Sequence, residues 1–261
     1  MRKLTLFVVA LFVANMSFAQ KGLEFGLSFT PASPWILNDE DFAEGDDLNY
    51  RGTFGFNTGL TLGYNFTDAV GFHTGVQFSR QGQNYINYNS APEKADMDVF
   101  SRKLGYVRIP LLLKFNGDPT ASSSSYFRIG PHLDLLNSAK YAYDDKSVLN
   151  SDQAIDLRQF TKPLSTDKYK IYKGLVVGLT LEMGGAVNMT EELKLVFMLH
   201  MSGSLTNPEL TEAGEAGLAI RANSLGLNVN PYPSSASYNR SSAWSVMGGF
   251  TVGFHYVLGF E

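Results

Sequence analysis

Apolar and polar residues alternate along much of the chain, and this period of two is that of a β-strand. In residues 53–65, aromatic and aliphatic side chains take most even positions, while glycine, threonine and asparagine take the odd ones. Residues 243–260 repeat the pattern just as clearly. We predict eight strands on this basis, at residues 22–30, 53–65, 70–80, 103–115, 125–136, 173–189, 193–206 and 243–260.

The segment 103–115 shows what the two faces of such a strand contain. Its odd positions from Val107 to Phe115 are all apolar, whereas the even positions include Arg108, Pro110 and Lys114. In a soluble protein the apolar face would turn inward. The rest of the chain decides whether that holds here.

Short and long connections alternate strictly between the predicted strands. Residues 65–69, 116–124 and 188–192 form short turns, and residues 31–52, 81–102, 137–172 and 207–242 form long loops. Sorting the connections by length to opposite ends is typical of outer-membrane barrels. We therefore predict an all-β fold, an eight-stranded antiparallel up-and-down transmembrane β-barrel with four long external loops and short periplasmic turns.

In such a barrel the apolar faces meet lipid, and the glycines, hydroxyls and charges fill a narrow lumen. Arg108 and Lys114 then point inward. Pro110 also points inward, but it has no N–H to give to the sheet, and a closed barrel has no free edge. We expect a bulge or a lost hydrogen bond at this proline.

The N-terminus reads as an export signal. Arg2 and Lys3 precede an apolar run, and the small residues Ser17 and Ala19 follow at the usual cleavage spacing. We expect residues 1–19 to be the signal peptide and residues 20–261 to be the barrel domain, located in the outer membrane of the cell. The absence of cysteine excludes both a disulfide scaffold and a lipid-modified cysteine.

Charge adds one exclusion. The chain has 21 Lys and Arg against 25 Asp and Glu, so its net charge is only mildly negative. Nucleic-acid binding usually requires a clear excess of basic residues. We expect no nucleic acid among the partners.

Two neighbouring stretches carry a family resemblance. "YVRIPLLLKF", from Tyr106, is followed after a short turn by "YFRIGPHLDLL". Together they resemble the central hairpin of the PorT-like family of bacterial outer-membrane β-barrel proteins, with its Tyr-x-x-Ile-Pro-Leu-Leu core. The resemblance implies an eight-stranded barrel inserted by the outer-membrane assembly machinery. Some members of that family are linked to protein secretion.

Ionisable residues gather on the predicted lumen faces. Two interpretations are open: a catalytic or metal-binding cluster, or a polar plug in which the charges are paired, as burial requires. We favour the plug and expect no catalytic residue, metal or cofactor, with Arg108 and Glu182 as members of one charge network. The predicted lumen polar network consists of Glu24, Arg108, Lys114, Arg128, Asp134, Glu182, Lys194, His73, His132, His200 and His255.

The long loops offer weaker signals. The acidic residues 38–47 could hold calcium, although a solvated loop is the usual explanation and the EF-hand glycine is absent. Residues from Asn207 onward have partial helical spacing, which leaves a short helix over the barrel mouth and an irregular loop as alternatives. Aromatic residues near strand ends are typical of interfacial anchoring; these are Trp35, Tyr238, Trp244 and Tyr256.

The predicted function is that of a non-enzymatic integral outer-membrane protein. An eight-stranded lumen is filled by side chains, which disfavours a porin. The protein would act through its external loops or through membrane partners, in secretion or envelope maintenance. The expected partners are outer-membrane lipid and lipopolysaccharide, the assembly machinery, and secretion or envelope proteins. The alternatives are a barrel enzyme acting on lipid or peptide, and a small-ligand binder at the mouth.

Overall fold

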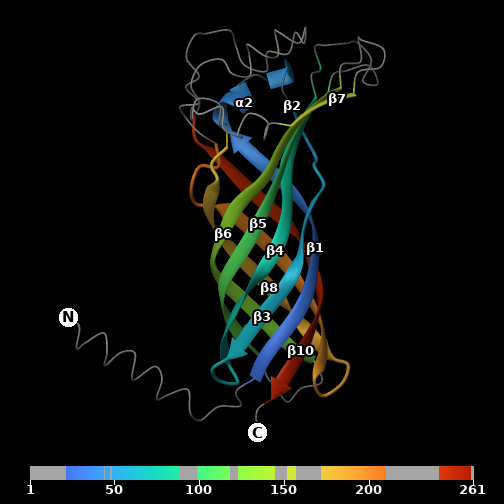
Figure 1. Ribbon diagram of the computed structural model, residues 1–261, viewed down its shortest axis with the longest axis vertical. Coiled ribbons are helices and arrows are strands. Elements are labelled where there is room, and N and C mark those ends of the chain that lie inside the picture. Colours follow the sequence, from blue (N-terminus) through green and yellow to red (C-terminus); the bar gives the residue numbers. More distant parts are fainter. Residues whose placement is uncertain are drawn as a thin grey trace, which may run out of the picture.

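The computed structural model shows a tall barrel of tilted strands, in which the first described strand begins beside the end of the last one at the base (Figure 1). The structure describes residues 22–43, 45–47, 49–86, 88, 99–117, 123–144, 152–156, 172–209 and 241–259. The predicted signal peptide, Tyr238 and most of the loop after Glu209 lie outside these residues.

In the part of the chain that the structure describes, eight long strands build the barrel wall, and two short strands and two short helices lie beside it at one end. The short elements are α2 (Asp39–Ala43), a 3-10 helix (Gly45–Asp47), β2 (Asn49–Arg51) and β7 (Asp152–Asp156). The wall strands are β1 (Gly22–Asn38), β3 (Gly55–Asn65), β4 (Val70–Ile86), β5 (Val99–Asn116), β6 (Ser123–Asp144), β8 (Leu175–Asn188), β9 (Leu193–Ser204) and β10 (Ala243–Gly259).

The wall strands close on themselves. Within the described residues, each of the eight pairs antiparallel with two neighbours, in the order β4, β3, β1, β10, β9, β8, β6 and β5. The pairing of β5 with β4 joins the two ends of this series. The predicted eight-stranded up-and-down barrel is confirmed.

Side chains alternate across the wall as the sequence pattern predicts. Leu60 is 69% exposed on the outside, whereas its neighbour Thr61 is 6% exposed and faces the lumen. Val252 and Thr251 differ in the same way, with Thr251 buried. The outward residues form the apolar band that a lipid environment requires.

Connections also sort by length, but four strands run farther than expected. We call the end of the barrel that carries the long connections the long-loop end. There, β1 continues to Asn38, β4 to Ile86 and β6 to Asp144, while β5 begins at Val99. Three of the predicted long loops are therefore shorter than expected. The alternation of apolar and polar residues is lost in these extensions. Arg80 and Lys103 occupy outward positions there, and an outward residue has to be apolar only where it meets lipid.

Pro110 interrupts the ladder as expected. The β4–β5 pairs stop at Thr74–Leu111 and resume at Gln77–Arg108, so Ile109 and Pro110 have no partner on β4. Thr74 Oγ1 donates a hydrogen bond of 2.7 Å to the Pro110 carbonyl in this gap. The bulge itself lies nearby, where the β5–β6 register shifts between Gly105 and Tyr106.

None of the helices in the described part of the chain is long and apolar enough to cross a membrane.

Candidate functional site

All eleven predicted lumen residues lie on inward-facing positions of the barrel strands. Ten of them are buried, with exposed fractions of 5% or less. Lys194 differs because it is half-buried near the short-turn end, and it forms no ion pair with the described residues. The structure thus places ten predicted residues in the interior and leaves Lys194 at its margin.

Glu24 is the centre of the contacts nearest the short turns. Its carboxylate accepts a hydrogen bond from Lys114 Nζ and contacts His255 Nδ1. The Arg128 guanidinium lies 3.8 Å from the same carboxylate. Tyr126 covers this group, with Lys114 Nζ 4.4 Å from its ring centre. Two buried cations, Lys114 and Arg128, therefore compensate the negative charge of the Glu24 carboxylate.

Arg128 continues the contacts upward. Its Nη1 donates to Glu182 Oε2 at 3.4 Å and lies 3.3 Å from His73 Nε2. The His73 ring stacks on that of His255, with 5.8 Å between ring centres. Two buried carboxylates, from β1 and β8, thus bind one arginine from β6.

Histidine and serine side chains link this group to the next. His200 Nδ1 lies 3.0 Å from Glu182 Oε1, and His200 Nε2 lies 3.3 Å from Ser202 Oγ. Ser202 Oγ in turn accepts a hydrogen bond of 3.0 Å from Arg108 Nη1. Glu182 and His200 are also register partners in the β8–β9 ladder, whereas β9 and β5 are not neighbours in the wall and are joined across the lumen by the Ser202–Arg108 contact.

Arg108 and Asp134 form the strongest pair of the upper lumen. Arg108 donates from Nε and Nη2 to the two Asp134 oxygens, at 2.7 and 2.8 Å. Gln81 Nε2 donates to Asp134 at 3.0 Å, and Gln81 Oε1 accepts from Ser245 at 2.6 Å. Among the described residues Arg108 and Glu182 share no direct contact, and His200 and Ser202 link them.

His132 lies beside this pair, 3.6 Å from Asp134 and 2.8 Å from Thr180 Oγ1. A small cavity borders Arg108, Asp134 and Ser202. We call the connected side chains the lumen network: Glu24, His73, Gln81, Arg108, Lys114, Arg128, His132, Asp134, Glu182, His200, Ser202, Ser245 and His255. It runs from the short-turn end to the upper lumen.

Glycine makes room for the histidines. A Cβ at Gly26 would lie 2.5 Å from both His255 and Thr61, and one at Gly178 would lie 2.4 Å from His132. Real Cβ atoms do not approach other atoms so closely. These two inward positions therefore need glycine so that imidazole rings fit inside a narrow barrel.

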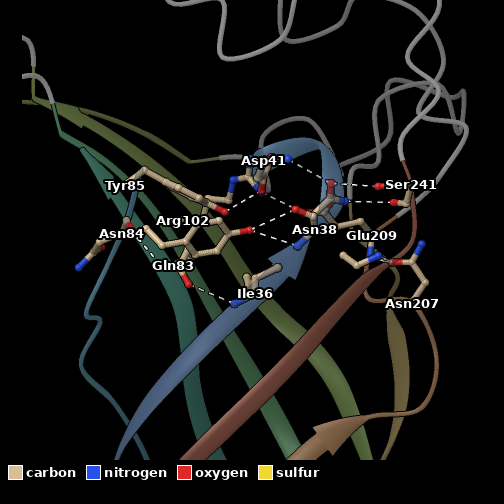
Figure 2. A network of polar contacts seen from close by, with 12 residues as sticks. Ile36, Asn38, Asp41, Gln83, Asn84, Tyr85, Arg102, Asn207, Glu209 and Ser241 are labelled. Atoms are coloured by element: carbon tan, nitrogen blue, oxygen red, sulfur yellow. Dashed lines mark hydrogen bonds and ion pairs between the residues drawn. The ribbon is translucent and has the colours of Figure 1, made fainter. Parts of the chain in front are cut away.

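A second group of polar side chains lies in contact at the long-loop end, and it was not predicted as a group (Figure 2). Arg102 Nη1 donates to Asp41 Oδ2 at 3.0 Å and to Glu209 Oε1 at 3.1 Å. The Tyr85 hydroxyl donates to the same Asp41 oxygen at 2.8 Å. We call Asn38, Asp41, Tyr85, Arg102 and Glu209 the mouth cluster.

The mouth cluster joins elements that are far apart in the chain. Asp41 lies in α2, Glu209 follows β9, and Arg102 belongs to β5. Asn38 Nδ2 donates to the Ser241 carbonyl at 3.1 Å, which ties the end of β1 to the start of β10. The expectation of a solvated loop at residues 38–47 is wrong for Asp41, which is 1% exposed.

Side chains also replace the backbone ladder at one point of the mouth. The β1–β3 pairs end at Ala32–Gly55, and beyond them Ile36 N–H donates to Gln83 Oε1 at 3.2 Å. Asn38 N–H donates to the Tyr50 hydroxyl at 3.1 Å. Burial raises the pKa of Tyr50 above its ordinary value. The phenol therefore remains a neutral hydrogen-bonding group.

An apolar layer separates the mouth cluster from the lumen network. It consists of Ile36, Leu104, Tyr106, Ala139, Tyr172, Val176 and Ala243, all buried. Ile36 and Leu104 are each two residues from a member of the mouth cluster along β1 and β5. The sequence signal that could have found Arg102 was its even position, which continues the inward parity of Leu104 and Tyr106.

The family comparison agrees with this architecture. The family model described as "Outer membrane protein beta-barrel domain" matches residues 14–208, which is more than half of the chain. The chain belongs to this outer-membrane β-barrel family. Its membership places the barrel in the outer membrane, so the apolar outer band faces lipid. A search of the curated proteins found no match.

Solved outer-membrane proteins are similar to this barrel at low sequence identity. Neisserial surface protein A is 13% identical with a TM-score of 0.40, covering 90% of this chain and 96% of its own. OprG from Pseudomonas aeruginosa is also 13% identical with a TM-score of 0.40, covering 93% and 97%. Ail of Yersinia pestis is 13% identical with a TM-score of 0.34, covering 90% and 99%.

Chemically, the lumen of this outer-membrane β-barrel protein holds its charges in mutual contact. Each buried carboxylate of the lumen network is bound by at least one arginine or lysine. In the described part of the chain, no group of three or more His, Asp or Glu residues has the arrangement of a metal site. The geometry is that of a cross-linked interior.

Proposed function

We propose that this protein is a non-enzymatic component of the outer membrane that works through its long-loop end, where it binds a protein partner. The process we propose is protein secretion or envelope maintenance, which the PorT-like resemblance of the hairpin from Tyr106 suggests. The barrel serves as a rigid support for that end.

The observation that supports this proposal is that side chains fill the interior of the barrel at successive heights. The lumen network spans the lower and upper lumen, the apolar layer follows, and the mouth cluster lies above it. Removing one partner of a buried ion pair is costly, because it leaves the other charge without compensation. Such an interior supports a role that needs neither a pore nor a mobile catalytic group.

Exposed aromatic residues favour the long-loop end as the working surface. Phe42 in α2 is 55% exposed, although its ring stacks on Tyr50 with 4.4 Å between ring centres. Tyr88 is 37% exposed at the same end. Exposed aromatics on a rigid base are frequent contact residues in protein interfaces. The mouth cluster supplies that base because it fixes α2 to β5.

Photo-cross-linking in the native membrane tests the proposal. A photoreactive amino acid at Phe42 or Tyr88 should capture one discrete envelope or secretion protein. The matched control is Met189, which is 55% exposed in a short turn at the opposite end. Equal capture from Met189, or no capture from the long-loop end, would contradict the proposal.

The enzymatic alternative has its own outcome in the same cells. A general base contributes about 10²–10⁴-fold to a rate, so an imidazole-dependent enzyme should lose its activity when His132 and His200 are both replaced. A correctly folded His132→Gln/His200→Gln barrel that changes the lipid or cleaved-peptide profile would overturn the non-enzymatic proposal.

A further inference from the structure

Arg128 and His73 meet in the lumen, towards the short turns, in a contact that depends on the charge of the histidine. Arg128 Nη1 lies 3.3 Å from His73 Nε2. A guanidinium has donors only, so His73 Nε2 accepts this hydrogen bond and carries no proton. The one proton of the neutral ring is therefore on Nδ1. A second proton, on Nε2, would replace the hydrogen bond by a contact between two cations.

The permanent charges around this contact are already balanced. Among the described members of the lumen network, three carboxylates face three permanent cations, which are Glu24, Asp134 and Glu182 against Arg108, Lys114 and Arg128. Buried charges are tolerated when they compensate each other. A proton on His73 adds a positive charge that no further carboxylate of this set compensates. The existing pairs then have to be redistributed.

Ionisable side chains from five other strands surround His73. They are Arg128 of β6, His255 of β10, Glu24 of β1, Glu182 of β8 and, bound to Glu24, Lys114 of β5. The ring stacks on His255, and β3 places the uncharged Gly63 opposite it. Its Nδ1 has no hydrogen-bond partner among the described residues. Neither of the two carboxylates is thus bound to His73 in the observed arrangement.

Arg128 has unused donors for another arrangement. Its Nε and Nη2 have no hydrogen-bond partner within the described residues. These two nitrogens share one edge of the guanidinium, the fork that can bind a carboxylate through two parallel hydrogen bonds. Glu24 Oε1 is 3.8 Å from Nη2, just beyond hydrogen-bond distance. A small displacement would bring this fork onto Glu24 and take Nη1 away from His73 and Glu182.

We propose that Arg128 and His73 form a proton-operated switch inside the barrel. In the neutral state, which the structure shows, Arg128 binds Glu182 and donates to His73. In the acid state His73 is protonated, Arg128 binds Glu24 through its fork, and His73 takes its place beside Glu182. The two cations then no longer touch, and each of the two carboxylates still has a cationic partner.

The switch has a route to the upper lumen. Glu182 also contacts His200, whose other ring nitrogen contacts Ser202. An exchange of the cation at Glu182 therefore acts on the link between Ser202 and Arg108. Acid around the cell would change the interior of a barrel whose wall stays closed. This device is independent of the protein partner proposed above, and either can fail without the other.

The first measurement follows the ring nitrogens of His73 by solid-state NMR of the 15N-histidine-labelled protein in phosphatidylcholine bilayers. Spectra are recorded from about pH 8 to about pH 4, on both sides of the ordinary histidine transition. The variant His73→Gln assigns the signals by difference. We expect a neutral ring with its proton on Nδ1 at the alkaline end and a doubly protonated ring at the acid end. A proton on Nε2 at the alkaline end would overturn the switch.

The second measurement determines which carboxylate Arg128 binds. Double-mutant cycles combine Arg128→Met with Glu182→Gln or with Glu24→Gln, and urea unfolding gives the coupling at both ends of the pH range. Arg128 should couple more strongly to Glu182 in the neutral state and to Glu24 in the acid state. In a His73→Gln background this order should not reverse, because glutamine accepts a hydrogen bond and gains no charge.

His132→Gln is the matched control, because His132 is as deeply buried as His73 but lies beside Asp134. The reversal should persist in this variant. An order that does not reverse in wild type would overturn the switch. A reversal that persists in His73→Gln would overturn His73 as the trigger. A reversal that His132→Gln also abolishes would show a general effect of repacking the lumen, which contradicts a switch at Arg128 and His73.

Discussion

Arg108 and Asp134 are paired twice in this barrel. They occupy opposite register positions on β5 and β6, and two of the arginine nitrogens bind the two carboxylate oxygens at 2.7 and 2.8 Å. The two side chains are 3% and 4% exposed, so the charges have little access to water. Backbone pairing and side-chain pairing therefore fix the same two strands at the same height.

Separating this pair should be costly in either direction. We expect Arg108→Met or Asp134→Leu alone to lower the free energy of unfolding by about 3–5 kcal/mol, because each leaves one buried charge without its partner. The double variant Arg108→Met/Asp134→Leu should recover a large part of that loss. Urea unfolding of the barrel in lipid vesicles measures all three variants.

Arg108 and Glu182 serve as the comparison for that cycle. They share no direct contact, so Arg108→Met/Glu182→Gln should show losses close to the sum of the single changes, apart from the weaker link through His200 and Ser202. Equal coupling energies for both pairs would contradict the contacts described for Asp134.

The sequence predicted the wall of the barrel well because lipid imposes its pattern. Wherever a strand crosses the membrane, its outward positions must be apolar, and the period of two follows directly, as in residues 53–65. Beyond the lipid that requirement ends. Arg80 and Lys103 then occupy outward positions, the period fades, and the extensions of β4 and β5 could not be recognised.

Partners inside the lumen were beyond a one-dimensional pattern. Parity shows which face a residue occupies, but the tilt and stagger of the strands determine its height. Arg108 therefore could not be assigned to Asp134 instead of Glu182. Asp41 was missed for another reason: it lies in an acid-rich segment that resembles a solvated loop, and its partner Arg102 is 61 residues away.

Gly178 offers a test of packing inside the lumen. A methyl group there would lie 2.4 Å from His132 and 2.5 Å from the Gly203 carbonyl. We expect Gly178→Ala to destabilise the barrel by about 1–3 kcal/mol, because overpacking forces neighbouring groups to move. The measurement is the unfolding midpoint in urea.

Gly248 is the matched control, because a Cβ at this outward position of β10 has no atom within 4 Å. Gly248→Ala should leave the midpoint within the range of neutral surface changes. Similar losses for the two alanine variants would mean that steric crowding by His132 is not the cause.

The mouth cluster should act as a local latch whose loss leaves the wall intact. Arg102→Met removes the common partner of Asp41 and Glu209, so we expect faster amide hydrogen exchange in α2 and around the Tyr172–Glu209 bridge. Exchange in β8 and β9 should not change. Mass spectrometry of the exchanged peptides provides the measurement.

Lys103→Met is the control for this change, since Lys103 is the next residue on β5 but points outward and contacts neither acid. It should leave exchange in α2 unaltered in neutral detergent. Global acceleration in Arg102→Met would show that the mouth cluster holds the whole barrel together, which would contradict a local latch.

Orientation in the membrane can be tested with single cysteines, because the chain has none of its own. The barrel topology predicts that the long-loop end faces the outside and the short turns face the periplasm. Asp46 and Asp68 are exposed at the two opposite ends, and neither forms a described ion pair. A membrane-impermeant maleimide should label Asp46→Cys on intact cells. It should label Asp68→Cys only after the outer membrane is opened.

Asp41 is unsuitable for such a probe because it is buried against Arg102, and a tag there would disturb the mouth cluster. Glu191→Cys, in a different short turn, repeats the periplasmic test independently. Labelling of Asp68→Cys and Glu191→Cys on intact cells, with Asp46→Cys protected, would reverse the orientation.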